Sequence, residues 1–174
     1  KINYKNSYYR RDIGLQYMLE NNQLNNLSNS NQSNRYSKVA IIGSTNGTSI
    51  LQLLKECKNK NINASVEVII TNRKKAGILE KAKEFGIPFI YLPSKRGVSR
   101  EEYDAKIVNI LRIFNIDLVF LVGYMRIVSS VLINEYNDRL LNIHPSLLPK
   151  YGGLMNLDVH ENILKHNERF SGCT

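Results

Sequence analysis

The sequence predicts an α/β fold, a Rossmann-like, open, mostly parallel and twisted sheet with helices on both faces. Short apolar runs at 39–43, 66–71 and 117–123 have the length and β-branched content of buried strands, and stretches with helical spacing separate them. Strands that alternate with helices pair in parallel, because a crossover returns the chain to the same direction. The predicted order is β-α-β-α-β-α-β-α-β.

The first 37 residues differ in composition from the rest of the chain. They are rich in Asn, Ser, Tyr and Gln, above all over 21–34. Such a segment buries too little apolar surface to offset its ordering entropy, so we expect 1–37 to be a disordered leader. We expect 38–174 to be one globular domain, C-terminally incomplete because 171–174 read as the beginning of a strand.

Charge, cysteine content and hydropathy limit the kinds of ligand, bond and cellular location that we expect. The formal charge is +9, but Lys and Arg are spread along the chain, which favours a small phosphorylated ligand over a nucleic acid. Cys57 and Cys173 lie far apart, so we expect two ordinary buried thiols and neither a disulfide nor a metal site. No apolar run reaches membrane-spanning length, and we expect a cytoplasmic protein without a membrane partner, or an organellar one if a transit segment precedes Lys1.

A turn of small residues follows the first strand. Residues 44–49 are Ser-Thr-Asn-Gly-Thr-Ser, and helical spacing begins at Ile50 and extends toward Cys57. Such a turn presents free N–H groups and hydroxyls at a helix N-terminus, which is the usual physical means of binding a phosphate. It has neither the Lys of a P-loop nor three spaced glycines, so an ordinary βα turn is the alternative.

The middle of the chain repeats the strand and helix pattern. We expect strands at 66–71 and 87–92, with a helix at 74–85 between them that Gly86 closes. The strand at 117–123 is the most apolar, and we expect it to be central because burial on both faces gives continuous hydrophobicity.

A capping box opens the next predicted helix. Ser99 and Glu102 have its spacing, and the helix should run to about Phe114. Arg100 in its first turn opposes the helix dipole, so it is either solvated or faces an anionic ligand.

An amide and an imidazole stand side by side near the end of the last predicted strand. Alternation over 140–144 places Leu141 and Ile143 on one face, and Asn142 and His144 on the other. Pro145 ends the strand and leaves His144 at its C-terminal tip, where open α/β sheets bind ligands. An Asn and a His that only satisfy a turn are the alternative.

Two further helices complete the prediction. One should run from about Ser129 to Tyr136, and one through 159–166. We expect His160 and His166, on the second of these, to have surface or packing roles rather than to bind a metal.

Three motifs in succession resemble the phosphoribosylglycinamide formyltransferase family: Asn-Gly-Thr-Ser at 46–49, Gly-Tyr-Met-Arg-Ile at 123–127 and Asn-Ile-His-Pro-Ser-Leu-Leu-Pro at 142–149. The resemblance covers about 38–174 and implies the formyltransferase fold. It further implies that a formyl group passes from 10-formyltetrahydrofolate, as co-substrate, to the amine of 5-phosphoribosylglycinamide in de novo purine synthesis, without a metal.

The resemblance also assigns the site residues. It implies that the substrate phosphate is bound by Gly47, Thr48 and Ser49, although position 49 is commonly Asn in the family. It implies that Asn142 and His144 act at the formyl group. The folate contacts that it implies come from Arg100, Met125, Arg126, Ile127, Val128 and Asn142.

The chemistry suits these residues. Attack of an amine on the formyl carbon develops an oxyanion that needs donors, and the Asn142 amide can donate. A protonated His144 can stabilise the same oxyanion and pass a proton to the leaving folate nitrogen. The family carries an Asp, in the loop after the next strand, that holds this His charged. That position is not reached before Thr174, so we expect low turnover from these residues alone.

Three alternative functions are consistent with parts of the sequence. Formyltetrahydrofolate deformylase usually has a second His where this chain has Pro145, and methionyl-tRNA formyltransferase differs after the catalytic His. The third alternative is not an enzyme but a non-catalytic nucleotide-binding module. The absence of the downstream Asp would favour this alternative.

Overall fold

The computed structural model describes residues 36–154 and 157–174. The chain divides into Lys1–Arg35 and Tyr36–Thr174. The leader predicted at 1–37 therefore lies almost entirely outside the described residues, and the fold is that of the second unit.

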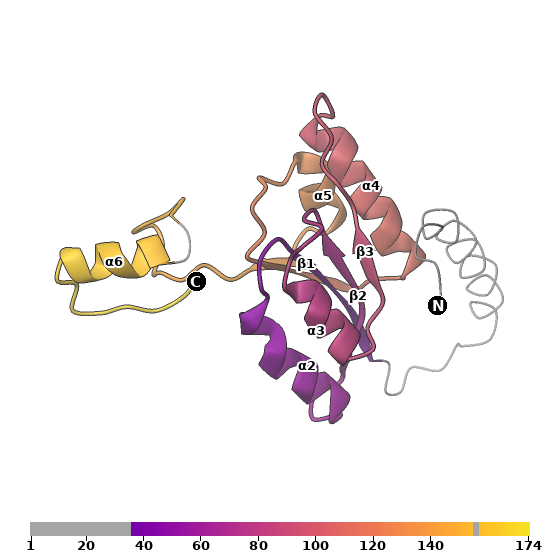
Figure 1. Cartoon of the computed structure of the whole chain (residues 1–174), viewed down its shortest axis with the longest axis horizontal. Helices are drawn as coiled ribbons and strands as arrows, with labels where there is room; N and C mark the ends of the chain where they lie inside the picture. Colours follow the sequence, from indigo (N-terminus) through magenta and orange to yellow (C-terminus); the bar gives the residue numbers. More distant parts are fainter. Residues whose placement is uncertain (1–35, 155–156) are drawn as a thin grey trace, which may run out of the picture. The chain divides into compact units, whose positions relative to one another are not determined.

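Five parallel strands form one sheet in the order β3-β2-β1-β4-β5, as Figure 1 shows in part. The predicted parallel α/β sheet is confirmed. The strands are β1 (Ser37–Gly43), β2 (Ala64–Thr71), β3 (Phe89–Tyr91), β4 (Leu118–Val122) and β5 (Leu140–Asn142).

Helices cover both faces of this sheet (Figure 1). One face packs against α2 and α3, so that Ile41 of β1 shares a buried cluster with Leu54 and Ile78. The other face packs against α4 and α5, where Ile42 shares a second cluster with Ile107 and other apolar residues. The helices are the short 3₁₀ helix η2 (Thr48–Ile50), α2 (Leu51–Lys58), α3 (Ile78–Glu84), α4 (Arg100–Ile113), α5 (Ser130–Glu135) and α6 (Leu157–Lys165).

The predicted boundaries of α3 and β3 are wrong. The strand β4 lies between β1 and β5, so it is a central strand and not an edge strand, as its continuous hydrophobicity predicted, and β1 is in the middle of the sheet. The helix α3 begins at Ile78 rather than 74, since Arg73 N–H donates to Thr71 Oγ1 over 3.2 Å and starts a turn. The strand β3 is confined to Phe89–Tyr91, rather than the predicted 87–92.

Over the parts of the chain that the structure describes, no helix is both long and apolar enough to span a membrane.

The strand order reverses between β1 and β4. The chain moves outward from β1 through β2 to β3 and then returns to the other side of β1. The carboxyl ends of β1 and β4 therefore flank the crevice in which open α/β sheets bind ligands.

Ser44, directly after β1, joins the loops at this crevice. Its side chain donates to Asn72 Oδ1 over 2.7 Å and accepts from Met125 N–H over 3.0 Å. Its own N–H donates to the Gly123 carbonyl over 3.2 Å. Because Ser44 is buried, these bonds are shielded from water and tie together the loops after β1, β2 and β4.

Gly123 allows the loops after β1 and β4 to touch. Its φ of 54° lies in the left-handed region, and a Cβ at this position would collide with Thr45 Oγ1. A side chain here would meet both a backbone penalty and a steric one.

The capping box at the start of α4 is confirmed. Ser99 Oγ accepts from Glu102 N–H, and Glu102 Oε2 accepts from Ser99 N–H, both over 3.0 Å. Ser129 occupies the same position before α5, but its side chain makes no capping bond, and its buried Oγ has no partner among the described residues.

These two serines give a matched test of the cap. We expect Ser99→Ala to lower the free energy of unfolding by about 1 kcal/mol, because an N-cap bond is lost. Ser129→Ala removes a buried hydroxyl that has no partner among the described residues, so it should not lower the free energy of unfolding by a comparable amount. Urea denaturation measures both, and equal losses would contradict the assignment.

Gly123→Ala should destabilise the fold more than Gly97→Ala does. Gly97 also has a positive φ, of 85°, but a Cβ there would meet nothing within 4 Å. The control therefore reports the backbone penalty alone, about 1–2 kcal/mol, and the collision with Thr45 should add about 1 kcal/mol or more. Thermal unfolding of both variants compares them; similar losses would show that the loops are not in contact.

Candidate active site

A cavity of about 450 Å³ lies at the crevice between β1 and β4. It is bounded by the loops after β1, β4 and β5 and by residues at and before α6. Six of the residues predicted for the site line it: Gly47, Thr48, Ser49, Met125, Asn142 and His144. The predicted phosphate loop and the predicted catalytic pair thus share one cavity.

The predicted phosphate loop, residues 44–49, leads into a helix N-terminus. Gly47 precedes η2, which continues directly into α2, and no side chain among the described residues caps either start. Thr48 and Ser49 are exposed, whereas Gly47 is buried against α3, where a Cβ would come within 2.7 Å of Ile78 Cγ1. Hydroxyls and N–H groups at the positive end of a helix dipole can bind an anion.

The strand β5 ends at Asn142, so the prediction from the alternation that it extends to His144 is wrong. It is an edge strand, and its pairing with β4 stops at Asn142, so the following backbone takes another partner. His144 N–H donates to the Thr174 carbonyl over 2.8 Å, and Thr174 N–H donates to the His144 carbonyl over 2.9 Å. The segment 171–174, predicted to begin a strand, therefore makes backbone bonds but no assigned strand.

The ring of His144 has one described contact. Its Nε2 lies 3.2 Å from the carbonyl oxygen of Tyr151. A carbonyl can only accept, so this hydrogen bond requires a hydrogen on Nε2. In the neutral ring Nδ1 is then an acceptor, and in the charged ring it is a second donor.

Of the segment 125–128, only Met125 reaches the cavity. The guanidinium of Arg126 lies 4.1 Å from the centre of the Tyr103 ring, and its Nη1 donates to Ser94 Oγ over 2.5 Å. Ile127 is 74% exposed, and Val128 packs on the core under α4 and α5. The side chain of Arg126 thus joins two loops, while the predicted folate contacts of this segment remain predictions.

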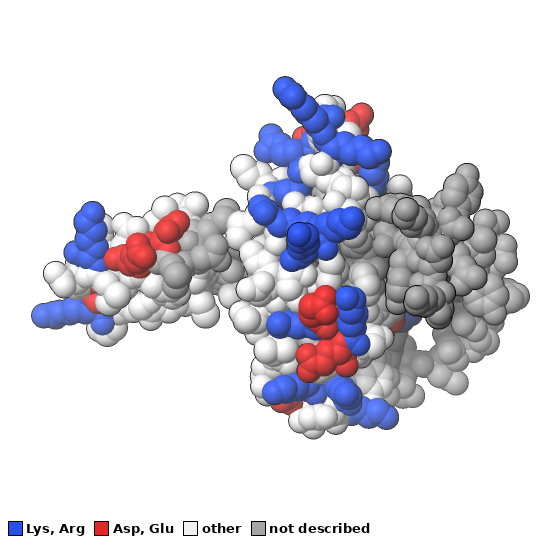
Figure 2. Space-filling view, viewed as in Figure 1, with Lys and Arg blue, Asp and Glu red and all other residues white. Residues whose placement is uncertain are grey.

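Arg100 is exposed at the start of α4 and is not among the residues that line the cavity. Its predicted folate contact also remains a prediction. Other cations border the phosphate loop, since Arg73, Lys74 and Lys75 line a separate hollow beside Thr45. On the face drawn in Figure 2, Lys and Arg form several separate groups rather than one continuous band.

Sequence reasoning missed eight residues that line the cavity: Thr45, Gly123, Tyr124, Ile143, Pro145, Gly153, Leu154 and His160. His160 is exposed, as predicted, but its placement after an irregular loop gave no signal that it faces the cavity. Burial raises the pKa of Tyr103 to about 12 and also raises the pKa of the neighbouring Tyr124. Both phenols are therefore neutral at physiological pH.

The cysteines are both free, and the prediction that both are buried is wrong. Cys57 is partly buried, which raises the pKa of its thiol, and Cys173 is exposed. Within 36–154 and 157–174, no group of three His, Cys, Asp or Glu side chains is placed to hold a metal ion.

Residues 37–174 match the family model described as formyl transferase. The chain is 38% identical over 144 residues to the trifunctional purine biosynthetic protein adenosine-3 of Drosophila melanogaster, covering 82% of this chain and 10% of that protein. It is 35% identical over 136 residues to the phosphoribosylglycinamide formyltransferase of Escherichia coli, covering 78% of this chain and 63% of that protein. It therefore spans less than two thirds of either relative.

A solved structure has the same fold. Glycinamide ribonucleotide transformylase 1 from Symbiobacterium toebii matches with a TM-score of 0.76 and 32% identity, over 84% of this chain and 69% of that one. Because the family model covers most of the described fold, including the whole cavity, the chain belongs to the formyl transferase family.

Proposed function

We propose that this chain takes part in transferring a formyl group from 10-formyltetrahydrofolate to the amine of 5-phosphoribosylglycinamide, a step of de novo purine synthesis. The observation that carries the proposal is that a helix N-terminus suited to a phosphate and an Asn/His pair suited to acyl transfer line the same cavity. The E. coli relative named for this activity supports the same choice.

The phosphate would be held at Gly47, Thr48 and Ser49, because their N–H groups lie at the start of η2 and the Thr48 and Ser49 residues are exposed. The ribose and amine would then extend toward Asn142 and His144 across the cavity. In this role the phosphate anchors the substrate, and its binding energy restricts the position of the reacting amine.

In the transfer, the amine nitrogen bonds to the formyl carbon, and the bond from that carbon to the folate nitrogen breaks. The Asn142 amide donates to the oxyanion that develops on the formyl oxygen. With Nε2–H bonded to the Tyr151 carbonyl, the transferable proton of a charged His144 is the one on Nδ1. The amine loses a proton and the leaving nitrogen gains one, so the proton count balances.

Two further roles belong to the same proposal. Met125, Arg126, Ile127, Val128, Asn142 and Arg100 would contact the folate. We further propose that the protein acts on small molecules in the cytoplasm. An organelle is the alternative location, since one relative in Arabidopsis thaliana carries the description chloroplastic.

Substitution at the catalytic pair tests the chemistry. We expect His144→Ala to lower kcat by about 10²–10⁴-fold, because a general acid is lost. Asn142→Ala should lower it by about 10²-fold through loss of an oxyanion donor. Formation of formylglycinamide ribonucleotide and tetrahydrofolate measures both rates in the full-length protein, and Asn109→Ala, an exposed Asn on α4, is the matched control. Formate release without the acceptor amine would instead indicate a deformylase.

Substitution in the phosphate loop tests substrate binding. Ser49→Ala should raise KM for 5-phosphoribosylglycinamide by roughly tenfold, because about 1.4 kcal/mol of hydrogen bonding is lost. The matched control is Ser130→Ala, another exposed Ser at the start of a helix. With the dephosphorylated substrate, the two variants should not differ; an equal effect of Ser49→Ala on both substrates would exclude this loop as the phosphate site.

A further inference from the structure

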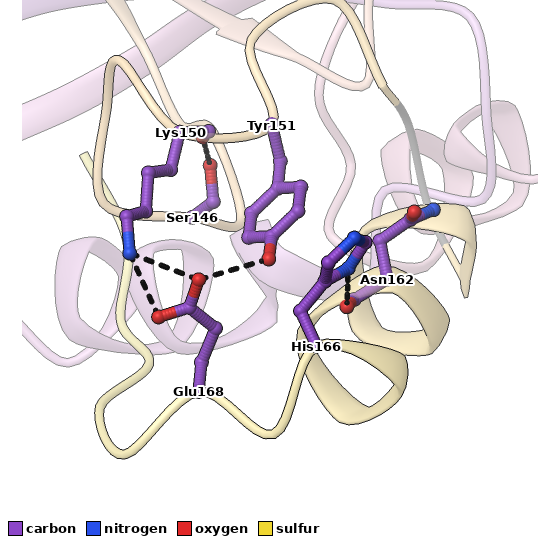
Figure 3. Close-up of polar contacts among 6 residues, drawn as sticks. All are labelled: Ser146, Lys150, Tyr151, Asn162, His166 and Glu168. Carbon is purple, nitrogen blue, oxygen red and sulfur yellow. Dashed lines mark hydrogen bonds and ion pairs between the residues drawn. The ribbon is translucent and has the colours of Figure 1, made fainter.

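We infer that Glu168 is a positioning residue for His144, and that it acts through Tyr151. The loop that follows His144 and the turn that follows α6 meet at this carboxylate (Figure 3). The catalytic consequence rests on the proposed function, whereas the chain of contacts does not.

Glu168 binds two consecutive residues of the loop. Lys150 Nζ donates to its two carboxylate oxygens over 2.9 and 2.8 Å, and the Tyr151 hydroxyl donates to Oε1 over 3.1 Å, as Figure 3 shows. The hydrogen bond from Lys150, together with that from Tyr151, holds the pKa of Glu168 below its usual range. The carboxylate is therefore charged at neutral pH and accepts from both partners.

Tyr151 has a backbone that needs support. Its φ of 59° is uncommon for a residue with a side chain. Neighbouring bonds hold the peptide on both sides, since Ser146 Oγ donates to the Lys150 carbonyl over 2.7 Å and Leu154 N–H donates to the Tyr151 carbonyl over 3.2 Å. The bond from the phenol to Glu168 fixes the remaining end of the residue.

The carbonyl of Tyr151 is the group that reaches the catalytic ring. It accepts from His144 Nε2 over 3.2 Å, and so it selects the tautomer with hydrogen on Nε2 and fixes the rotation of the ring. Release of Glu168 would free the phenol, relax the backbone at Tyr151 and move the acceptor. A small displacement of a catalytic group can lower a rate strongly without unfolding the protein.

If Glu168 had a purely structural role, its loss would lower the melting temperature rather than kcat alone. The Lys150 side chain is 63% exposed and that of Glu168 is 23% exposed. Ion pairs of this kind contribute little to stability, so their loss should leave the melting temperature within about 3 °C. The Arg112–Glu135 pair is a matched case, because it is also bidentate and exposed but lies between α4 and the end of α5.

The experiment uses the full chain with ¹⁵N-labelled histidine. In the wild type, the Nε2–H proton of His144 should give a resonance slowed in its exchange with water, identified by its absence in His144→Ala. Tyr151→Phe and Glu168→Ala should each broaden or remove this resonance and lower kcat by about tenfold, with KM changed less than about twofold. Glu168→Gln keeps an oxygen acceptor for the phenol and should retain the resonance, and Glu135→Ala should resemble the wild type.

The outcomes separate the two proposals. An unchanged Nε2–H resonance in both Tyr151→Phe and Glu168→Ala would overturn the positioning role, as would an equal loss of kcat in Glu135→Ala. If the wild type forms no formylglycinamide ribonucleotide, the proposed function fails, while the resonance still tests the path from Glu168 to His144.

Discussion

The parallel pairing of β4 with β1 is the constraint on which the site depends. Ile42 of β1 lies opposite Leu121 of β4, so the two strands end side by side and their loops begin at the same edge. Since β2 and β3 lie on the far side of β1, no other strand closes the space between these loops. The buried bonds of Ser44 then hold the loops at this edge, and the cavity follows from the topology.

The two halves of the site are supported differently. The predicted phosphate loop is short, enters a helix directly and packs through Gly47 on α3, so its N–H groups are held by the core. His144 lies beyond the edge strand, where only Thr174 and Tyr151 bond to it among the described residues. Its orientation therefore depends on a loop, and that loop depends on a surface carboxylate, Glu168.

Local patterns predicted what local forces decide. The capping box at Ser99 and the apolar runs of β1, β2 and β4 identified their elements, because hydrophobic period and cap chemistry act within a few residues. The middle position of β1 was not predictable in this way, since strand order depends on pairing between distant segments. The contacts of Glu168 escaped prediction for the same reason: it meets Lys150 and Tyr151 only through the fold.

We propose that one substrate spans the predicted phosphate loop and His144. The most direct measurement is an NMR titration of the full chain with 5-phosphoribosylglycinamide, following the amides of Gly47, Thr48 and Ser49 and the ring of His144. We expect all these signals to shift with the same dissociation constant. Shifts at the loop with no response at His144, or the reverse, would contradict it.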